Sequence, residues 1–145
     1  MDTDTLSFTR TIAASPARVF TLMTDSDARQ LWNSPGDDAT VTVTHPAKTA
    51  PGARETALVE MPGEPDTVVH TDWTTVTEDT IAYAETLEVE GAPLATSLAT
   101  ATLAADGDGT KVTLEVALVS YAGQEMLEGY RMGYEAAYES LFKAT

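Results

Sequence analysis

The chain has 145 residues, of which 23 are acidic and 8 are basic, so its formal net charge at neutral pH is −15. This charge disfavours nucleic acid and anionic membrane surfaces as partners, and the absence of cysteine excludes disulfides, thiolate metal sites and cysteine nucleophiles. With 43% apolar residues, no run long enough to span a membrane and no secretion pattern, the sequence predicts one globular, cytoplasmic domain over residues 1–145.

The N-terminal part of the sequence predicts one strand followed by two short helices. Apolar and polar residues alternate over residues 5–14, which is typical of a strand. Ser15 and Pro16 are a typical N-cap and first turn of a helix. A second short helix is expected from Asp25 and ends at the segment Asn33-Ser34-Pro35-Gly36. The side chains expected to face the core are Leu6, Phe8, Ile12, Val19, Phe20, Leu22, Met23, Ala28, Leu31 and Trp32.

The central part of the sequence predicts six strands joined by turns. These strands are expected over residues 39–45, 54–61, 67–77, 80–90, 94–105 and 110–120. The segment Asp106-Gly107-Asp108-Gly109 is a strong hairpin signal. Strands that follow one another at this spacing indicate an antiparallel meander.

The last segment, residues 124–143, contains no proline and predicts a long amphipathic helix. Its apolar face is made by Leu127, Tyr130, Tyr134, Ala137, Tyr138 and Leu141. This face needs a surface to cover. A seven-stranded sheet with one apolar face can curl around the helix and bury both surfaces, so we expect an α+β fold.

Three segments carry a resemblance to a known superfamily. They are FTRTIAASPARVFTLMTD at residues 8–25, Leu31-Trp32, and Gly133-Tyr134 through Leu141. Together with the order of elements, they resemble the START-like superfamily, also called Bet v 1-like or SRPBCC. Within it, the chain is most similar to the family of the C-terminal domain of the activator of the ninety-kilodalton heat-shock protein ATPase. The segment TAPGARE replaces that family's glycine-rich start of the third strand.

This resemblance implies a helix-grip fold. In this fold, a seven-stranded curved antiparallel sheet surrounds a long C-terminal helix, and two short helices lie between strands 1 and 2. A cavity is expected between the sheet and the helix. The C-terminal half of the helix should pack tightly, with Leu141 in the core, whereas the N-terminal half should roof the cavity, with Tyr130 in its wall.

The aromatic residues are the candidates for a binding site. Five tyrosines and two tryptophans accompany only three phenylalanines. Tyrosines that face one enclosed space would make an apolar pocket with a few polar groups, as in small-molecule sites. Ordinary core packing is the alternative, and the resemblance favours a cavity. The candidate ligand-binding residues are Phe20, Trp32, Trp73, Tyr83, Met126, Leu127, Tyr130 and Tyr134.

Other chemistry has weaker support in the sequence. His45 and His70 are not part of a metal-binding pattern, so we expect structural roles, no metal and no cofactor. No serine lies in a Gly-x-Ser-x-Gly motif, and no catalytic residue is assigned. Arg10, on the apolar side of its strand, is expected to pair with a glutamate near the sheet edge. The alternative is that it binds a ligand carboxylate.

The preferred hypothesis is a protein that binds a small apolar or aromatic molecule, as a monomer or weak homodimer, with no nucleic-acid or membrane partner. One alternative is a cyclase- or hydrolase-like enzyme that uses tyrosine hydroxyls, His70 or Arg10. Another alternative, implied by the resemblance, is a module that interacts with a chaperone. The named activator also has a separate N-terminal domain, for which this chain has no room, so this alternative ranks last.

Overall fold

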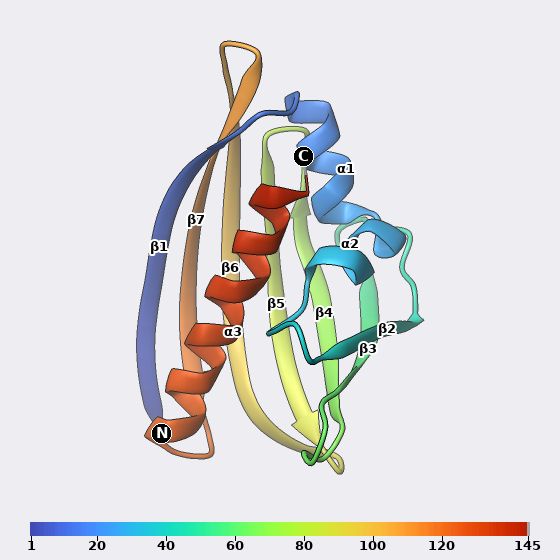
Figure 1. The fold of residues 1–145 in the computed structure, drawn as a ribbon, viewed down its shortest axis with the longest axis vertical. Helices are drawn as coiled ribbons and strands as arrows, with labels where there is room; N and C mark the ends of the chain where they lie inside the picture. The colour runs from blue at the N-terminus through green and yellow to red at the C-terminus, as the bar shows by residue number, and fades with distance from the viewer. Residues whose placement is uncertain (145) are drawn as a thin grey trace.

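The computed structural model describes residues 1–144, in which a seven-stranded antiparallel sheet curves around a long helix (Figure 1). The elements are β1 (Asp2–Ile12), α1 (Pro16–Thr24), α2 (Ser26–Trp32), β2 (Thr40–His45), β3 (Arg54–Glu60), β4 (Thr67–Val76), β5 (Thr80–Val89), β6 (Ala92–Asp106), β7 (Gly109–Ser120) and α3 (Gln124–Lys143). The helix-grip fold expected from the sequence is therefore confirmed.

The strands lie in the order β1-β7-β6-β5-β4-β3-β2. From β2 to β7 each strand pairs with its neighbour in the sequence, as a meander does. The N-terminal strand β1 instead pairs with β7, with Asp2 opposite Ser120 and Ile12 opposite Thr110. The two short helices leave β1 at one end of the sheet and return the chain to β2 at the other edge (Figure 1).

The two short helices begin where the sequence predicts. The Ser15 hydroxyl accepts a hydrogen bond from the Arg18 N–H at 3.2 Å, and Pro16 occupies the first turn of α1. The carboxylate of Asp25 accepts from the Ala28 N–H at 3.0 Å and begins α2. Asp25 is also the C-cap of α1, so one residue makes the corner between the helices.

For one residue of α2, the predicted position in the core is wrong. Leu31 is 85% exposed, whereas Arg29 and Trp32 are buried. Residues three apart share one face of a helix, so Arg29 and Trp32 face inward together and Leu31 points away from the core. The sequence pattern misassigned Leu31 because it follows apolar residues only, and the inward residue Arg29 is charged.

The long helix α3 has the predicted bounds, and its predicted apolar stripe is buried. Gly123 precedes it with a φ of 94°, a conformation that favours glycine. Near the other end of the helix, Tyr138 makes edge-to-face contacts with Trp32 at 5.3 Å and with Phe8 at 5.7 Å between ring centroids. The C-terminal half of α3 therefore packs on α2 and β1.

The structure also tests two further expectations from the sequence. Arg10 pairs with Glu139 of α3 at 2.7 Å, which confirms the expected ion pair at the sheet edge. The strand expected from residue 94 begins earlier, at Ala92, because Glu90 and Gly91 both have positive φ and turn the chain in two residues. A register shift in β5 at Leu87 and Glu88 accommodates this early pairing.

Candidate functional site

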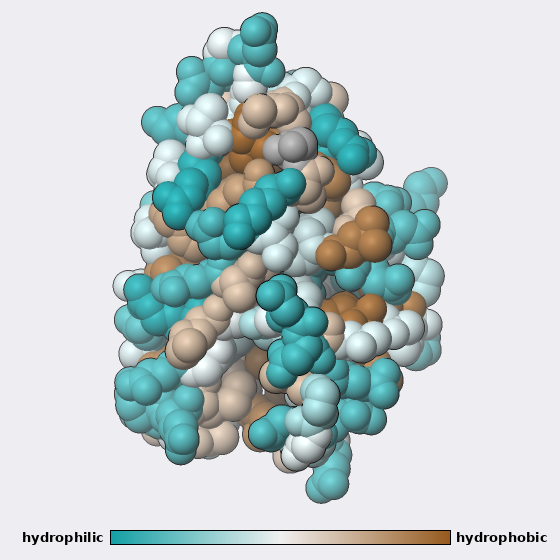
Figure 2. Space-filling view, viewed as in Figure 1, coloured by the Kyte–Doolittle hydropathy of each residue, from teal (hydrophilic) through white to brown (hydrophobic). Residues whose placement is uncertain are grey.

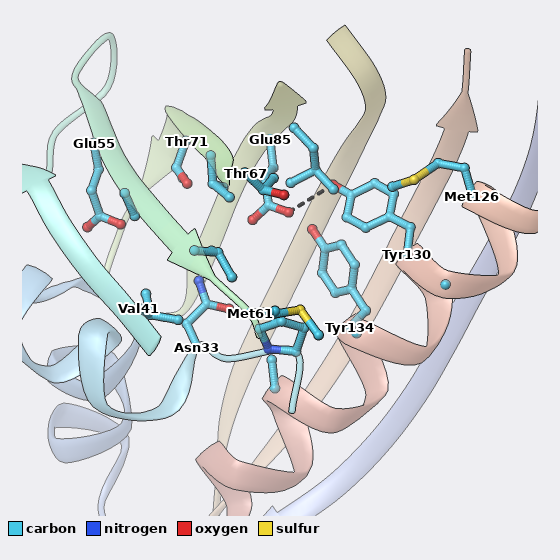
Figure 3. A pocket seen from close by; sticks show the side chains of 18 residues that line it. Asn33, Val41, Glu55, Met61, Thr67, Thr71, Glu85, Met126, Tyr130 and Tyr134 are labelled. Atoms are coloured by element: carbon cyan, nitrogen blue, oxygen red, sulfur yellow. Dashed lines mark hydrogen bonds between the residues drawn. The ribbon is translucent and has the colours of Figure 1, made fainter. Parts of the chain in front are cut away.

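A pocket of about 200 Å³ lies between the N-terminal half of α3 and the inner face of strands β2 to β5 (Figure 3). Its apolar wall consists of Pro35, Val41, Ala57, Val59, Met61, Val69, Leu87, Met126, Gly129, Gly133 and Ala137. Its polar groups come from Asn33, Glu55, Thr67, Thr71, Glu85, Tyr130 and Tyr134. The strand residues have odd numbers because alternate side chains of a strand point to the same face.

The mouth of the pocket is bordered by two glycines of α3. Gly129 and Gly133 lie one turn apart, on the face that Met126 and Ala137 share. A Cβ at Gly129 would meet no atom within 4 Å, and a Cβ at Gly133 would lie 3.3 Å from the Cβ of Pro35. Figure 2 shows this face of the molecule hollowed beside the lower part of α3. Gly129 therefore leaves open space beside the pocket, whereas Gly133 allows Pro35 to approach the helix closely.

A chain of hydroxyl groups leads from α3 to a buried carboxylate. The Tyr130 hydroxyl lies 2.8 Å from Oε1 of Glu85 and 2.8 Å from Oγ of Ser97 (Figure 3 shows the first contact). The Tyr134 hydroxyl lies 2.8 Å from the same serine oxygen. An ionised carboxylate can only accept. The single Tyr130 proton then goes to Glu85, Ser97 donates to Tyr130, and Tyr134 donates to Ser97.

Of the two carboxylates in the pocket wall, Glu85 is the one without a basic partner in contact within residues 1–144. It is 7% exposed, and burial raises the pKa of its carboxyl above the ordinary value. The Tyr130 hydrogen bond and the charge of Arg29 oppose this shift, and the charge of Glu55 adds to it. Burial also raises the pKa of Tyr130 and Tyr134, so both hydroxyls keep their protons at neutral pH.

The second carboxylate of the wall, Glu55, is paired. Its Oε1 lies 3.2 Å from Nε of Arg29, and its Oε2 accepts a hydrogen bond from the Ser26 hydroxyl at 2.8 Å. Burial is the largest single influence and lowers the pKa of Arg29, but the charge and hydrogen bond of Glu55, together with Tyr83 and Tyr138, leave the pKa raised. The guanidinium also lies over the rings of Trp73, Trp32 and Tyr83. These ring faces stabilise the buried cation, whose Nη2 has no hydrogen-bond partner within residues 1–144.

The structure separates the eight predicted site residues into two groups. Met126, Tyr130 and Tyr134 line the pocket. The others do not line it: Trp32, Trp73, Tyr83 and Leu127 are buried in the core, and Phe20 packs partly buried against it. Two buried polar groups of this second group have partners: Trp32 Nε1 donates to the Leu22 carbonyl at 2.6 Å, and the Tyr83 hydroxyl lies 2.9 Å from that of Tyr138. The third, Nε1 of Trp73, has no hydrogen-bond partner within residues 1–144.

The polar groups of the strands are the part of the site that sequence reasoning missed. Glu85 lies between Tyr83 and Leu87 on the apolar side of β5, and Thr71 lies in the same way on β4. Glu55 precedes Ala57 on the inward side of β3. The signal in the sequence that indicates these groups is a carboxylate at an inward position of an alternating strand.

Two residues of the enzyme hypothesis lie away from the pocket. His70 is on the face of β4 opposite Thr71, where its ring contacts Thr56 at 3.0 Å and Glu88 at 3.3 Å. Arg10 is held by Glu139. Within residues 1–144 no group of three or more His, Cys, Asp or Glu side chains is placed to hold a metal ion. In the same described part of the chain, no helix is long and apolar enough to cross a membrane.

Solved structures similar to this fold come from several bacteria. The Mll3558 protein of Rhizobium loti has 23% identity and a TM-score of 0.82, with 99% of this chain and 98% of that chain covered. Protein CV1439 of Chromobacterium violaceum has 17% identity and a TM-score of 0.81, with coverages of 97% and 95%. Protein Ms6760 of Mycobacterium smegmatis has 20% identity and a TM-score of 0.75, with coverages of 99% and 95%.

No curated protein matches the sequence. A family model does match, and it extends over residues 3–140, which is nearly the whole chain. The chain therefore belongs to the family described as polyketide cyclase / dehydrase and lipid transport.

Proposed function

We propose that the protein binds a small apolar or aromatic molecule in the pocket between the sheet and α3. The observation that carries this proposal is the pocket wall, which is mainly apolar and includes a smaller number of polar groups. Small-molecule sites are built in this way. A cavity of about 150 Å³ is large enough for benzene. The pocket volume of about 200 Å³ therefore suits one aromatic ring with a short chain.

The family description supports ligand binding in general, because cyclases, dehydrases and lipid carriers all take up small, largely apolar molecules. The narrower resemblance to the heat-shock-protein activator family stays a prediction, as does the chaperone-interaction role that it implies. No specific observation favours that resemblance or that role, whereas the pocket favours ligand binding.

Filling the mouth of the pocket tests the proposal. Gly129→Leu should place a branched side chain in the opening, since a Cβ at this position meets no neighbouring atom. The matched control is Gly129→Ala, which also removes a helical glycine but adds only a methyl group. The probes are neutral single-ring compounds such as 2-phenylethanol, with binding measured by calorimetry and by the melting temperature.

We expect Gly129→Leu to weaken binding by about tenfold or more, which is about 1.4 kcal/mol, and Gly129→Ala to retain it. Melting curves without probe establish that both variants fold. Equal affinity of Gly129→Leu and the wild type would contradict binding in this pocket. Failure of every single-ring probe to bind the wild-type protein would contradict the proposed function itself.

An acid–base enzyme is the second candidate, and Glu85 is the observation that favours it. Burial raises the pKa of this carboxyl, and Tyr130 holds it in one orientation at the pocket wall. A general base works best with a pKa close to the working pH. The reaction class would be removal of a proton from a carbon next to a carbonyl group.

Acetophenone tests this second candidate because its single ring suits the pocket. The measurement is exchange of its methyl protons in D₂O, followed by NMR. Exchange that is faster with the wild-type protein and lost in Glu85→Gln, with binding retained, would support catalysis. Exchange at the buffer rate, with acetophenone bound, would leave the protein as a binder.

A further inference from the structure

The pocket wall has an unbalanced charge. Two carboxylates, Glu55 and Glu85, belong to the wall, whereas no lysine, arginine or histidine side chain is among the described residues that line it. The charge of Glu55 is compensated from behind by Arg29 at 3.2 Å. No basic group contacts Glu85 within residues 1–144, so its negative charge is the one that remains for a ligand to meet.

The geometry of Glu85 leaves one oxygen atom available. Oε1 accepts the hydrogen bond from Tyr130 at 2.8 Å, and Oε2 has no hydrogen-bond partner among residues 1–144. Oε2 is also not among the fully enclosed atoms that lack a partner, which places it at the pocket surface. The Tyr130 and Tyr134 hydroxyl protons are already used in the chain that ends on Oε1. The pocket therefore offers an acceptor beside its apolar wall.

The other polar groups of the pocket do not reverse this preference. Asn33, Thr67 and Thr71 are neutral and can each donate or accept. They can hydrogen-bond an alcohol, an amine or a carboxylate, so they do not select among them. Charge selection therefore depends on Glu85 and on the surrounding protein, whose net charge of −15 attracts cations and repels anions.

Resting on the proposed function, we propose that the pocket selects apolar amines, whose ammonium group pairs with Oε2 of Glu85 while the ring or short alkyl body fills the apolar wall. The ammonium group supplies the positive charge that the wall lacks. A neutral alcohol supplies only a hydrogen-bond donor. A carboxylate brings a second negative charge next to Glu85 and is disfavoured.

The first test uses the wild-type protein with three ring compounds of similar size: 2-phenylethylamine, 2-phenylethanol and phenylacetate. Dissociation constants are measured by calorimetry at pH 8. We expect the amine to bind about tenfold or more tightly than phenylacetate, with the alcohol between them, because hydrogen bonds to charged groups are the stronger ones. Phenylacetate binding as tightly as the amine would overturn this inference and leave the proposed function standing. If none of the three compounds binds, the proposed function itself is contradicted, and the inference falls with it.

The second test replaces the carboxylate. Glu85→Gln keeps the size of the side chain and an oxygen for Tyr130, and removes the charge. The control is Glu115→Gln, which makes the same charge change at an exposed position on β7. We expect Glu85→Gln to weaken amine binding by about tenfold and alcohol binding by less than about threefold. Glu115→Gln should leave both within about twofold, since exposed charges are screened.

Equal loss of amine affinity in the two variants would mean that the net charge of the whole protein, and not Glu85, favours the amine. This result would overturn the inference. Melting curves establish that each variant is folded. If Glu85→Gln does not fold, the ranking of the three compounds on the wild-type protein decides the question.

Discussion

The two halves of α3 use the same kind of residue for different purposes. Tyr138 in the C-terminal half and Tyr130 in the N-terminal half are 1% and 6% exposed, so burial barely distinguishes them. Tyr138 packs against Trp32 and Phe8, and its hydroxyl meets the neutral hydroxyl of Tyr83. The hydroxyl of Tyr130 instead meets a buried carboxylate at the pocket wall.

What lies beneath the helix explains this difference. At the packed end, the short helices lie beside α3 (Figure 1), and Trp32 of α2 and Phe8 of β1 pack against Tyr138. At the open end, strands β2 to β5 face the helix across the pocket, to which they present apolar side chains such as Val59 and Leu87 and the carboxylate of Glu85. The partner of a buried side chain therefore separates core from candidate site better than its exposure does.

The largest expected effect comes from the ion pair beside the packed end. Arg29→Met leaves the carboxylate of Glu55 buried without its counter-charge, and we expect a loss of about 3–5 kcal/mol in the free energy of unfolding. Urea denaturation measures it. The double variant Arg29→Met with Glu55→Leu removes both charges and should recover most of the loss. No recovery would mean that the arginine stabilises through its ring contacts alone.

The second prediction compares truncations at the two ends. Leu141 is fully buried, so Leu141→Ala leaves a hole and should cost about 2–5 kcal/mol. Met126 lines the pocket, where space is already open, so Met126→Ala should cost less than about 1.5 kcal/mol. Both are measured by urea denaturation. Equal costs would show that the open end is packed as tightly as the other.

The third prediction removes one hydroxyl from each end. We expect Tyr138→Phe and Tyr130→Phe each to cost about 0.5–1.5 kcal/mol, since water in the pocket can replace the Tyr130 hydroxyl beside Glu85. The two variants should differ in affinity for 2-phenylethylamine. Tyr130→Phe alters the Glu85 environment and should change it, whereas Tyr138→Phe should not. A change confined to Tyr138→Phe would place the site at the packed end.

The smallest expected effect is the pH dependence of stability due to Glu85. Because its folded-state pKa is raised, the stability it contributes is complete below the ordinary carboxyl pKa and is lost as the pH rises through the raised value. Gln carries no charge, so we expect Glu85→Gln to melt above the wild type at neutral pH, with the difference vanishing in acid. Glu115→Gln is the control, and a lower melting temperature of Glu85→Gln at neutral pH would contradict the assignment.

Much of the fold could be predicted from the sequence because local patterns carry it. The bounds of α3 follow from an uninterrupted helical period, and those of the meander follow from alternation between turn residues. The pairing of Arg29 with Glu55 could not be predicted, because the partners lie on different elements and charged residues are ordinarily placed outside. The burial of the arginine also explains the wrong placement of Leu31.

The candidate site could be predicted only on its helical side. Tyr130 and Tyr134 follow from the apolar stripe and from the resemblance. Trp73 and Tyr83 are candidates from the sequence because large aromatic rings suit both a core and a ligand site, and the sequence does not distinguish the two. Only the arrangement of the strands shows that they pack on Arg29, whereas Glu85 faces open space.

The pairing of β1 with β7 has a consequence for the order in which the protein forms. Every other strand pair joins neighbours in the sequence, but β1 has no partner in the sheet until nearly the whole chain has been synthesised. Closing so long a loop slows folding. The salt bridges from Asp4 to Arg131 and from Arg10 to Glu139 also join β1 to α3. We therefore expect β1 to be the last strand to dock, and its docking to hold α3 in place.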